Sequence, residues 1–379
     1  MKGEFLRVIM VTPGYYPIKG GTETVVRNLS ILLKKNGVHT DVMTFNMDRK
    51  WSPKWQGKIE RIDGITVFKV PALNWLPIEH SPRITLGVNL IPGRFANLLK
   101  QYDVIHFHEA DFSFPLFSIL ARKPKIFHLH GISVDFFKRY HLSRAILKHV
   151  ADLYISISKQ MRKDLIDLGI PREKIAYLPN GVDVRLFCPR KEKENNLLLF
   201  VGRITSGKGL HVLLESLRYL EESIHLVIIG PADCDLRYYQ NLFNTSIEKI
   251  NREGKHKITY LGALDQADIV EWYQKASIFV LPSFSEALPV ALLEALSCET
   301  PVIATPVGGV PEVVRNFENG ILVPVSNPLK LAEAIQYLLD NKKTRIKFGR
   351  AAREKVIRNF SIGVIAKRLC DIYEGIVSR

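Results

Sequence analysis

The chain has 379 residues, of which 46% are hydrophobic and 24% charged, a composition that excludes a disordered or fibrous protein and suits two globular domains. No apolar run approaches the ~20 residues of a membrane-spanning helix. The formal charge of +15 predicts an acidic partner, and the classes to choose from are nucleic acid, an anionic membrane surface and a phosphorylated small molecule.

The N-terminal segment and the cysteines indicate the compartment. Met1 leads directly into a strand pattern without the regions of a signal peptide, so we expect a cytoplasmic protein. The four cysteines are dispersed and show neither metal-ligand nor disulfide spacing: Cys188, Cys234, Cys298 and Cys370. There is no RNA-binding signature, zinc finger or clustered lysine tail, so nucleic acid is the least favoured acidic partner.

The first half of the chain has the pattern of a parallel sheet wrapped by helices. A buried strand at 6–12 ends in a Pro/Gly turn, and Gly20-Gly21-Thr22-Glu23 then opens an amphipathic helix. Further apolar strands are expected at 40–45, 103–108, 125–130 and 153–158. This half is predicted to be a Rossmann-like domain.

A second half with the same pattern follows a polar passage at 189–196. Its strands are expected at 197–201, 225–230, 258–261, 278–282, 301–304 and 320–323, alternating with helices. The predicted fold class is therefore α/β, with two doubly wound Rossmann-like domains that face each other across a cleft. We expect the domains at 1–185 and 186–360, and a C-terminal helix within 361–379 that either finishes the second domain or crosses back to the first.

Two loops beyond the carboxyl ends of strands, where open parallel sheets bind ligands, suit phosphate groups. Gly20 and Gly21 let backbone N–H groups approach an anion, although a tight connection alone also explains them. The loop Gly202-Arg203-Ile204-Thr205-Ser206-Gly207-Lys208-Gly209 carries two cations that suit a diphosphate, with solvated cations as the alternative. It is not a P-loop, because Lys208 is followed by glycine rather than serine or threonine.

Histidines end two strands of the first half, in His106-Phe107-His108-Glu109 and His128-Leu129-His130-Gly131. A metal site is the less favoured interpretation, because alternating residues share a strand face only in pairs and further ligands must come from elsewhere. We favour one catalytic or sugar-contacting histidine, ahead of packing. Asp233-Cys234-Asp235 has the D-x-D form of a metal–nucleotide site, but its place in a variable-looking loop after Pro231 favours a structural role.

The segment 136–150 combines aromatic residues with cations and places Leu142, Ile146 and Val150 at helical spacing. An amphipathic helix with a basic, solvated face is the favoured interpretation. A helix lying on an anionic membrane is the alternative.

Glu286 and Glu294 flank an apolar run at the start of a predicted helix, with Pro289 suited to the first helical position. If all the residues between them were helical, the two glutamates would be separated by roughly 12 Å, the scale of a nucleotide-sugar. A solvated helix would explain the pair taken alone, but the other motifs favour a ligand site.

In their order and spacing, these motifs resemble the retaining GT-B glycosyltransferases, in particular family 4, over nearly the whole chain. The matching segments are GGTE at 20–23, HG at 130–131, PNGVD at 179–183, GRITSGKG at 202–209, Glu286 with Glu294, and PVIATPVGGVPEVV at 301–314.

The resemblance implies a role for each matching position. Arg203 and Lys208 would hold the donor diphosphate and stabilise its charge in place of a metal ion, with Gly21 approaching the phosphates. Neither a metal nor another cofactor is expected. Pro289 stands where many relatives have glycine, and Cys298-Glu299 replaces a small residue and a glycine, which puts donor choice and the helix end in question.

The resemblance also implies contacts to the sugar and the ribose. His130 and Glu286 would be the catalytic residues at the transferring sugar, and Glu294 would bind the ribose hydroxyls. The backbone around these positions is expected nearby, at Ala287, Leu288, Pro289 and Val290. Closure of the cleft would complete the site and expel water.

The function implied is a retaining transfer of a hexose from a nucleotide-diphosphate sugar to a sugar, a lipid-linked molecule or another acceptor. The enzyme would be cytoplasmic, with peripheral binding to the inner face of the membrane as an option and no nucleic-acid partner. The alternatives are a GT-B-type sugar epimerase, an inverting transferase, a non-catalytic sugar-nucleotide-binding subunit and a nucleic-acid-binding protein.

Overall fold

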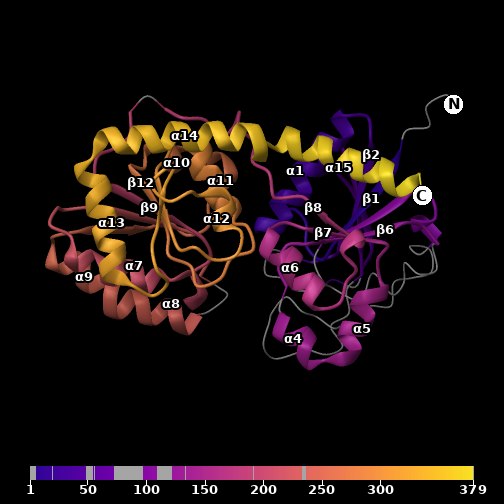
Figure 1. Ribbon diagram of the computed structural model, residues 1–379, viewed down its shortest axis with the longest axis horizontal. Coiled ribbons are helices and arrows are strands. Elements are labelled where there is room, and N and C mark those ends of the chain that lie inside the picture. Colours follow the sequence, from indigo (N-terminus) through magenta and orange to yellow (C-terminus); the bar gives the residue numbers. More distant parts are fainter. Residues whose placement is uncertain are drawn as a thin grey trace. The chain divides into compact units, whose positions relative to one another are not determined.

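The computed structural model describes residues 6–18, 20–47, 54, 56–71, 97–108, 122–132, 134–190, 192–232 and 236–378. The chain forms two compact α/β units, each with its own sheet (Figure 1). The first unit comprises Met1–Asn180 with Ile362–Arg379, and the second comprises Gly181–Ser361. The predicted fold class, two Rossmann-like α/β domains, is confirmed. No described helix is long and apolar enough to cross a lipid bilayer.

The sheet of the first unit has the strand order β3-β4-β2-β1-β5-β6-β7-β8. Every pairing is parallel except that of β3 with β4. The strands are β1 (Arg7–Thr12), β2 (His39–Phe45), β3 (Lys58–Ile62), β4 (Ile65–Val70), β5 (Val104–His108), β6 (Lys125–Leu129), β7 (Leu153–Ser156) and β8 (Ile175–Tyr177). The central strands are buried on both faces, as their continuous apolar runs require.

Helices cover this sheet, and the last one comes from the end of the chain. They are α1 (Gly21–Lys35), α4 (Val134–Arg139), α5 (His141–His149), α6 (Lys159–Asp167) and α15 (Ile362–Val377). The apolar face of α15, which includes Leu369, Tyr373 and Ile376, is buried, and α15 packs against α1. The C-terminal helix is thus part of the first unit.

The prediction of a single helix over 136–150 is wrong. The backbone of Tyr140 is extended (φ −108°, ψ 93°) and separates α4 from α5. Leu147 and Val150 are buried, while Lys138 and Arg139 lie exposed on α4. The segment therefore forms two short helices, and its two exposed Lys/Arg residues lie where the first one ends.

The sheet of the second unit is entirely parallel, in the order β11-β10-β9-β12-β13-β14. The strands are β9 (Leu197–Val201), β10 (His225–Ile229), β11 (Lys257–Tyr260), β12 (Ile278–Leu281), β13 (Val302–Ala304) and β14 (Ile321–Leu322). The helices are α7 (Leu210–Ser216), α8 (Leu236–Leu242), α9 (Glu248–Glu253), α10 (Gln266–Lys275), α11 (Val290–Ser297), α12 (Val310–Val313), α13 (Pro328–Asp340) and α14 (Lys342–Phe360).

Both faces of this second sheet are covered. Leu198 and Phe200 of β9 belong to a buried cluster that α7 and α13 complete. On the other side, the ring of Phe279 in β12 lies 5.8 Å from the ring of Tyr273 in α10. Because side chains alternate along a strand, this double covering explains why the strands read as continuous apolar runs.

Candidate active site

Three neighbouring strands of the second sheet, β9, β12 and β13, send their loops to the same edge. The loops span 202–209, 282–289 and 305–309, and each leads into a helix. Since the strands are parallel, their carboxyl ends meet at this edge, where sequence analysis places the donor. The loop segments that carry the predicted residues of the second half are thus neighbours.

Lys208 and Glu286 form an ion pair between two of these loops. The Lys208 Nζ lies 2.6 Å from Glu286 Oε1, and the Ser283 hydroxyl donates to the same oxygen over 2.7 Å. The side chains of Lys208 and Glu286 are only 20% and 6% exposed, so both are held in a largely dry environment. An ammonium has three N–H donors, which leaves Lys208 able to bind a second anion beside the carboxylate.

Backbone contacts hold the three loops together. The Phe284 N–H donates to the Gly207 carbonyl over 2.9 Å, and the Gly309 N–H donates to the Ala287 carbonyl over 2.8 Å. Gly308 has φ +54°, and a Cβ there would lie 1.5 Å from the Glu286 carbonyl oxygen. Only glycine fits this approach, so the glycine pair after β13 fixes the backbone that carries Glu286.

Arg203 lies two residues after the end of β9 and is partly exposed. No hydrogen bond or ion pair of its guanidinium with another described side chain is found. Its five N–H donors are thus suited to an anionic ligand at the same edge as Lys208.

Helix α11 begins one residue later than the sequence predicts. Pro289 is the residue that precedes the helix, with extended backbone (ψ 126°), and Val290 is the first helical residue. The assumption that the whole stretch between Glu286 and Glu294 is helical is therefore wrong, and the rise per residue behind the 12 Å estimate applies only from Val290 onward. Leu288 is buried, whereas Ala287, Pro289 and Val290 are partly exposed.

Glu294 lies on the second turn of α11 and is buried, with 8% of its surface exposed. The Tyr273 hydroxyl of α10 donates to Glu294 Oε2 over 2.8 Å. Burial raises the pKa of Glu294 to about 7, while the bond from Tyr273 opposes that rise. This carboxylate is consequently both oriented and close to its titration point at neutral pH.

The first unit contains the other predicted residues. His130 follows β6, is partly exposed, and its Nε2 lies 2.9 Å from His108 Nδ1. Burial lowers the pKa of His130 to about 4, against the effect of a hydrogen bond with Asn180, so this imidazole is neutral at pH 7. Gly21 is the first residue of α1, and a Cβ there would meet nothing within 4 Å.

The side chains that hold the acids in place carry little signal in the sequence. Ser283 lies three residues before Glu286, but nothing in a lone serine marks it as a partner. Tyr273 sits in a helical pattern where an aromatic residue is expected to be core. Glu109 and the Asp233-Cys234-Asp235 segment lie outside the described residues.

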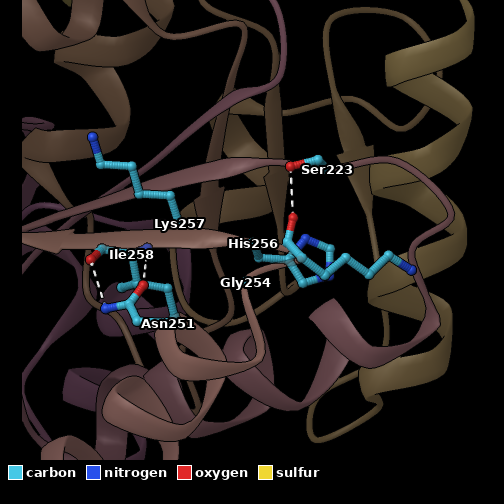
Figure 2. A pocket seen from close by; sticks show the side chains of 7 residues that line it. Ser223, Asn251, Gly254, His256, Lys257 and Ile258 are labelled. Atoms are coloured by element: carbon cyan, nitrogen blue, oxygen red, sulfur yellow. Dashed lines mark hydrogen bonds between the residues drawn. The ribbon is translucent and has the colours of Figure 1, made fainter.

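A hollow of about 390 Å³ lies at the opposite edge of the second sheet, at the amino ends of β10 and β11 (Figure 2). Its polar groups bond to one another: the Ser223 hydroxyl donates to the Lys255 carbonyl, and the Asn251 amide bridges the backbone N–H and carbonyl of Ile258. Figure 2 shows these side chains turned to the backbone. The polar side chains of the hollow thus bond to the backbone, whereas the site at the carboxyl edge contains an ion pair between two side chains.

Two family models match the chain in succession. Residues 19–186 match Glycosyltransferase Family 4, and residues 187–355 match Glycosyl transferases group 1. An uncharacterized glycosyltransferase of Methanocaldococcus jannaschii is 25% identical over 97% of this chain and 98% of its own length. A D-inositol 3-phosphate glycosyltransferase of Pseudarthrobacter chlorophenolicus is 25% identical over 88% of this chain and 85% of its own.

The fold matches as well. The crystal structure of the Anabaena protein HepE in complex with UDP and glucose superposes with a TM-score of 0.79 and 18% identity, covering 98% of this chain and 100% of that one. The two sheets, the loops at the carboxyl edge and the successive family matches lead to one conclusion. The chain belongs to the GT-B glycosyltransferases that join a family 4 N-terminal part to a group 1 C-terminal part.

Proposed function

We propose that this glycosyltransferase moves a hexose from a nucleotide-diphosphate sugar to a sugar, lipid-linked or other acceptor, with retention of anomeric configuration. The observation that carries the proposal is the part-buried Lys208–Glu286 pair at the carboxyl edge of the second sheet. Lys208 offers a cation to a phosphate, and Glu286 beside it offers a carboxylate to a hydroxyl. These two groups match the phosphate and the sugar that a sugar–phosphate bond joins. HepE, a structure of the same fold, was crystallised with UDP and glucose.

The roles follow from charge. When the sugar leaves, negative charge develops on the terminal phosphate, and Arg203 and Lys208 stabilise it without a metal ion at the phosphates. Glu286 accepts a hydrogen bond from a sugar hydroxyl, and Glu294 accepts hydrogen bonds from the ribose. None of these groups needs to act as a covalent nucleophile. In the retaining mechanism that the family resemblance implies, the acceptor attacks on the leaving-group face and the departing phosphate takes its proton.

The roles proposed for the first unit are contacts to the same donor. Gly21 offers a backbone N–H at the start of α1, with open space beside its Cα. His130, neutral at pH 7 and partly exposed, contacts the transferring sugar in this proposal. We also propose a cytoplasmic enzyme that binds anionic membrane through Lys138 and Arg139.

The test begins with a thermal-shift screen of the full chain against a panel of nucleotide-sugars. A true donor raises the unfolding temperature with concentration, because it binds only the folded state. With that donor, we expect Arg203→Ala and Lys208→Ala each to lower turnover by about 10²–10³-fold while the protein stays folded. Full turnover by folded Lys208→Ala would overturn its phosphate role.

Product analysis separates the alternatives. Transfer to an acceptor with the donor's anomeric configuration supports the proposal, an inverted product identifies an inverting transferase, and a changed sugar released without transfer identifies an epimerase. Donor binding with neither transfer nor hydrolysis would point to a non-catalytic subunit. Lys255→Ala, at the opposite edge of the sheet, is the control variant and is expected to keep full turnover.

A further inference from the structure

Three histidines of the first unit form a buried cluster on one face of its sheet. His106 and His108 alternate along β5, and His128 on β6 is the direct cross-strand neighbour of His108. Their exposed fractions are 0%, 1% and 1%. The strand register thus supplies the partner that the sequence alone could not place: two ligand candidates from one strand and a third from the next.

Two hydrogen bonds orient the rings of the β5 histidines. His106 Nδ1 lies 2.6 Å from the hydroxyl of Tyr373 on α15, and His108 Nδ1 lies 2.9 Å from His130 Nε2. Both bonds engage Nδ1 and leave Nε2 for another partner. This is the arrangement of metal-bound histidines, in which the nitrogen away from the metal donates to a fixed acceptor.

The remaining nitrogens of the cluster have no partner. His106 Nε2, His108 Nε2 and both ring nitrogens of His128 are buried and make no hydrogen bond. A buried polar atom without a partner has lost its hydrogen bonds to water and gained none in return, so such atoms are rare in native proteins. Three of these atoms, one on each ring, would be satisfied by a single occupant shared by the three rings, which leaves the second nitrogen of His128 unpaired.

The spacing fits a small cation. One nitrogen from each of His106, His108 and His128 can be chosen so that all lie within 4.8 Å of one another. A tetrahedral ion with bonds of about 2.0 Å needs about 3.3 Å between ligand atoms, which ring rotations and shifts on the order of 1 Å provide. An all-imidazole set favours zinc, cobalt, nickel or copper over magnesium and calcium, which prefer oxygen.

We propose that His106, His108 and His128 bind one divalent transition-metal ion, of the zinc class, inside the first unit. Three protein ligands leave one position of a tetrahedral ion for a water molecule. The ion holds the Nε2 atom of His108, so that the proton of this ring stays on Nδ1 and points at His130. His130 Nε2 then accepts this hydrogen bond, so the proton of the neutral His130 ring is on Nδ1. The metal site is separate from the site of the donor phosphates, for which no metal ion is proposed.

The first test measures metal binding by the full chain without a polyhistidine tag. The protein is stripped with a chelator and then titrated with Co²⁺ and Zn²⁺, with metal content measured by mass spectrometry and Co²⁺ followed by its visible absorption. We expect one equivalent per chain and the strong absorption of four-coordinate Co²⁺ with nitrogen ligands. Less than about a tenth of an equivalent would overturn the proposal and indicate water at the unpaired nitrogens.

The second test uses His128→Leu, because His128 makes no hydrogen bond that the substitution would break. We expect Co²⁺ affinity to fall by at least about 100-fold. In chelator the variant should unfold at the same temperature as the stripped wild type or higher, since an apolar side chain replaces unpaired nitrogens. Zn²⁺ should raise the unfolding temperature of the wild type only, and equal stabilisation of both would overturn the site.

Two further variants complete the design. His149→Ala removes an exposed histidine of the same unit and should keep full metal binding. Tyr373→Phe removes the hydroxyl that orients His106, and we expect about 10–100-fold weaker binding from a protein that folds normally. Metal affinity unchanged in Tyr373→Phe and lost in His149→Ala would assign the binding to the surface and refute the cluster.

Discussion

The Lys208 ammonium and the Glu286 carboxylate are partners of each other, so a ligand that separates them must compensate both. Inorganic phosphate offers an acceptor to Lys208 but no neutral donor to Glu286. A sugar diphosphate brings phosphate oxygens for the cation and a hydroxyl for the carboxylate. Because an unpaired buried charge is strongly unfavourable, this pair selects for ligands that carry both groups.

The proposed ribose role of Glu294 predicts that donor affinity depends on pH. Burial raises the pKa of this carboxyl to about 7, so it is largely protonated at pH 6 and largely ionised at pH 8. Ribose hydroxyls donate best to the carboxylate. We therefore expect the dissociation constant of the nucleoside diphosphate found by the donor screen to be about tenfold lower at pH 8 than at pH 6, measured by calorimetry.

Glu294→Gln is the control, because it meets the same ligand with a group that does not titrate. Its pH dependence should contain only the phosphate's own ionisation. Tyr273→Phe removes a bond that lowers the pKa, so the midpoint should move to higher pH. In the protein without ligand, rising pH has the opposite effect on stability. The folded state binds the Glu294 proton more tightly than the unfolded state does, so the contribution of Glu294 to the free energy of unfolding falls as pH rises from 4.5 to 7. A wild type that behaves like Glu294→Gln would contradict the ribose role.

At the scale of elements, apolar runs were enough to locate the interior strands. Every strand predicted from the sequence is present, with its ends within two residues of those expected. The β3–β4 hairpin was missed because β3 is exposed at the edge of the sheet and lacks an apolar run. Its turn had a signal, since Asp63 and Gly64 take positive φ (50° and 77°) in the two-residue turn that Asp-Gly favours.

Side-chain partners were harder to predict than strands. The Lys208–Glu286 pair joins residues 78 positions apart, and the Tyr273–Glu294 bond depends on how two helices pack. Local patterns contain no information on either distance. Motifs could thus name the acids and cations, whereas the groups that orient them required the fold.

The backbone at the end of α11 shows what one departure from the family pattern costs in stability. Glu299, where relatives commonly have glycine, has φ 55°, a left-handed conformation that disfavours a side chain. We expect Glu299→Gly to raise the free energy of unfolding by about 0.5–1 kcal/mol, the relief of that strain less the entropy of the added glycine. Denaturant unfolding measures the change.

Glu222→Gly provides the comparison. Glu222 is an exposed glutamate of the second unit, whereas Glu299 is partly exposed, and Glu222 is not among the residues with positive φ. There the new glycine only adds freedom to the unfolded chain, so the protein should lose about 0.5–1 kcal/mol. The prediction fails if both substitutions change stability in the same direction.

At the scale of the whole molecule, the net charge of +15 remains to be assigned to a partner. The exposed Lys138 and Arg139, beside Tyr140 with 49% exposure, form a patch suited to an anionic membrane surface. Each cation near such a surface contributes about 1 kcal/mol. We expect Lys138→Ala with Arg139→Ala to weaken binding to phosphatidylserine vesicles by about 30-fold in a flotation assay.

Lys249→Ala with Arg252→Ala makes the same change in net charge on exposed residues of α9 in the second unit. This double variant should float with anionic vesicles like the wild type. Equal loss of binding in both double variants would assign the effect to overall charge rather than to the patch. Neutral vesicles should bind none of the proteins.

The chain path also has a consequence for synthesis. The first unit is discontinuous, since α15 packs on α1 only after the whole second unit has been passed. On the ribosome, the apolar surface that later meets Leu369, Tyr373 and Ile376 stays uncovered while the second unit emerges and completes its own sheet. The domain that is made first is therefore finished last.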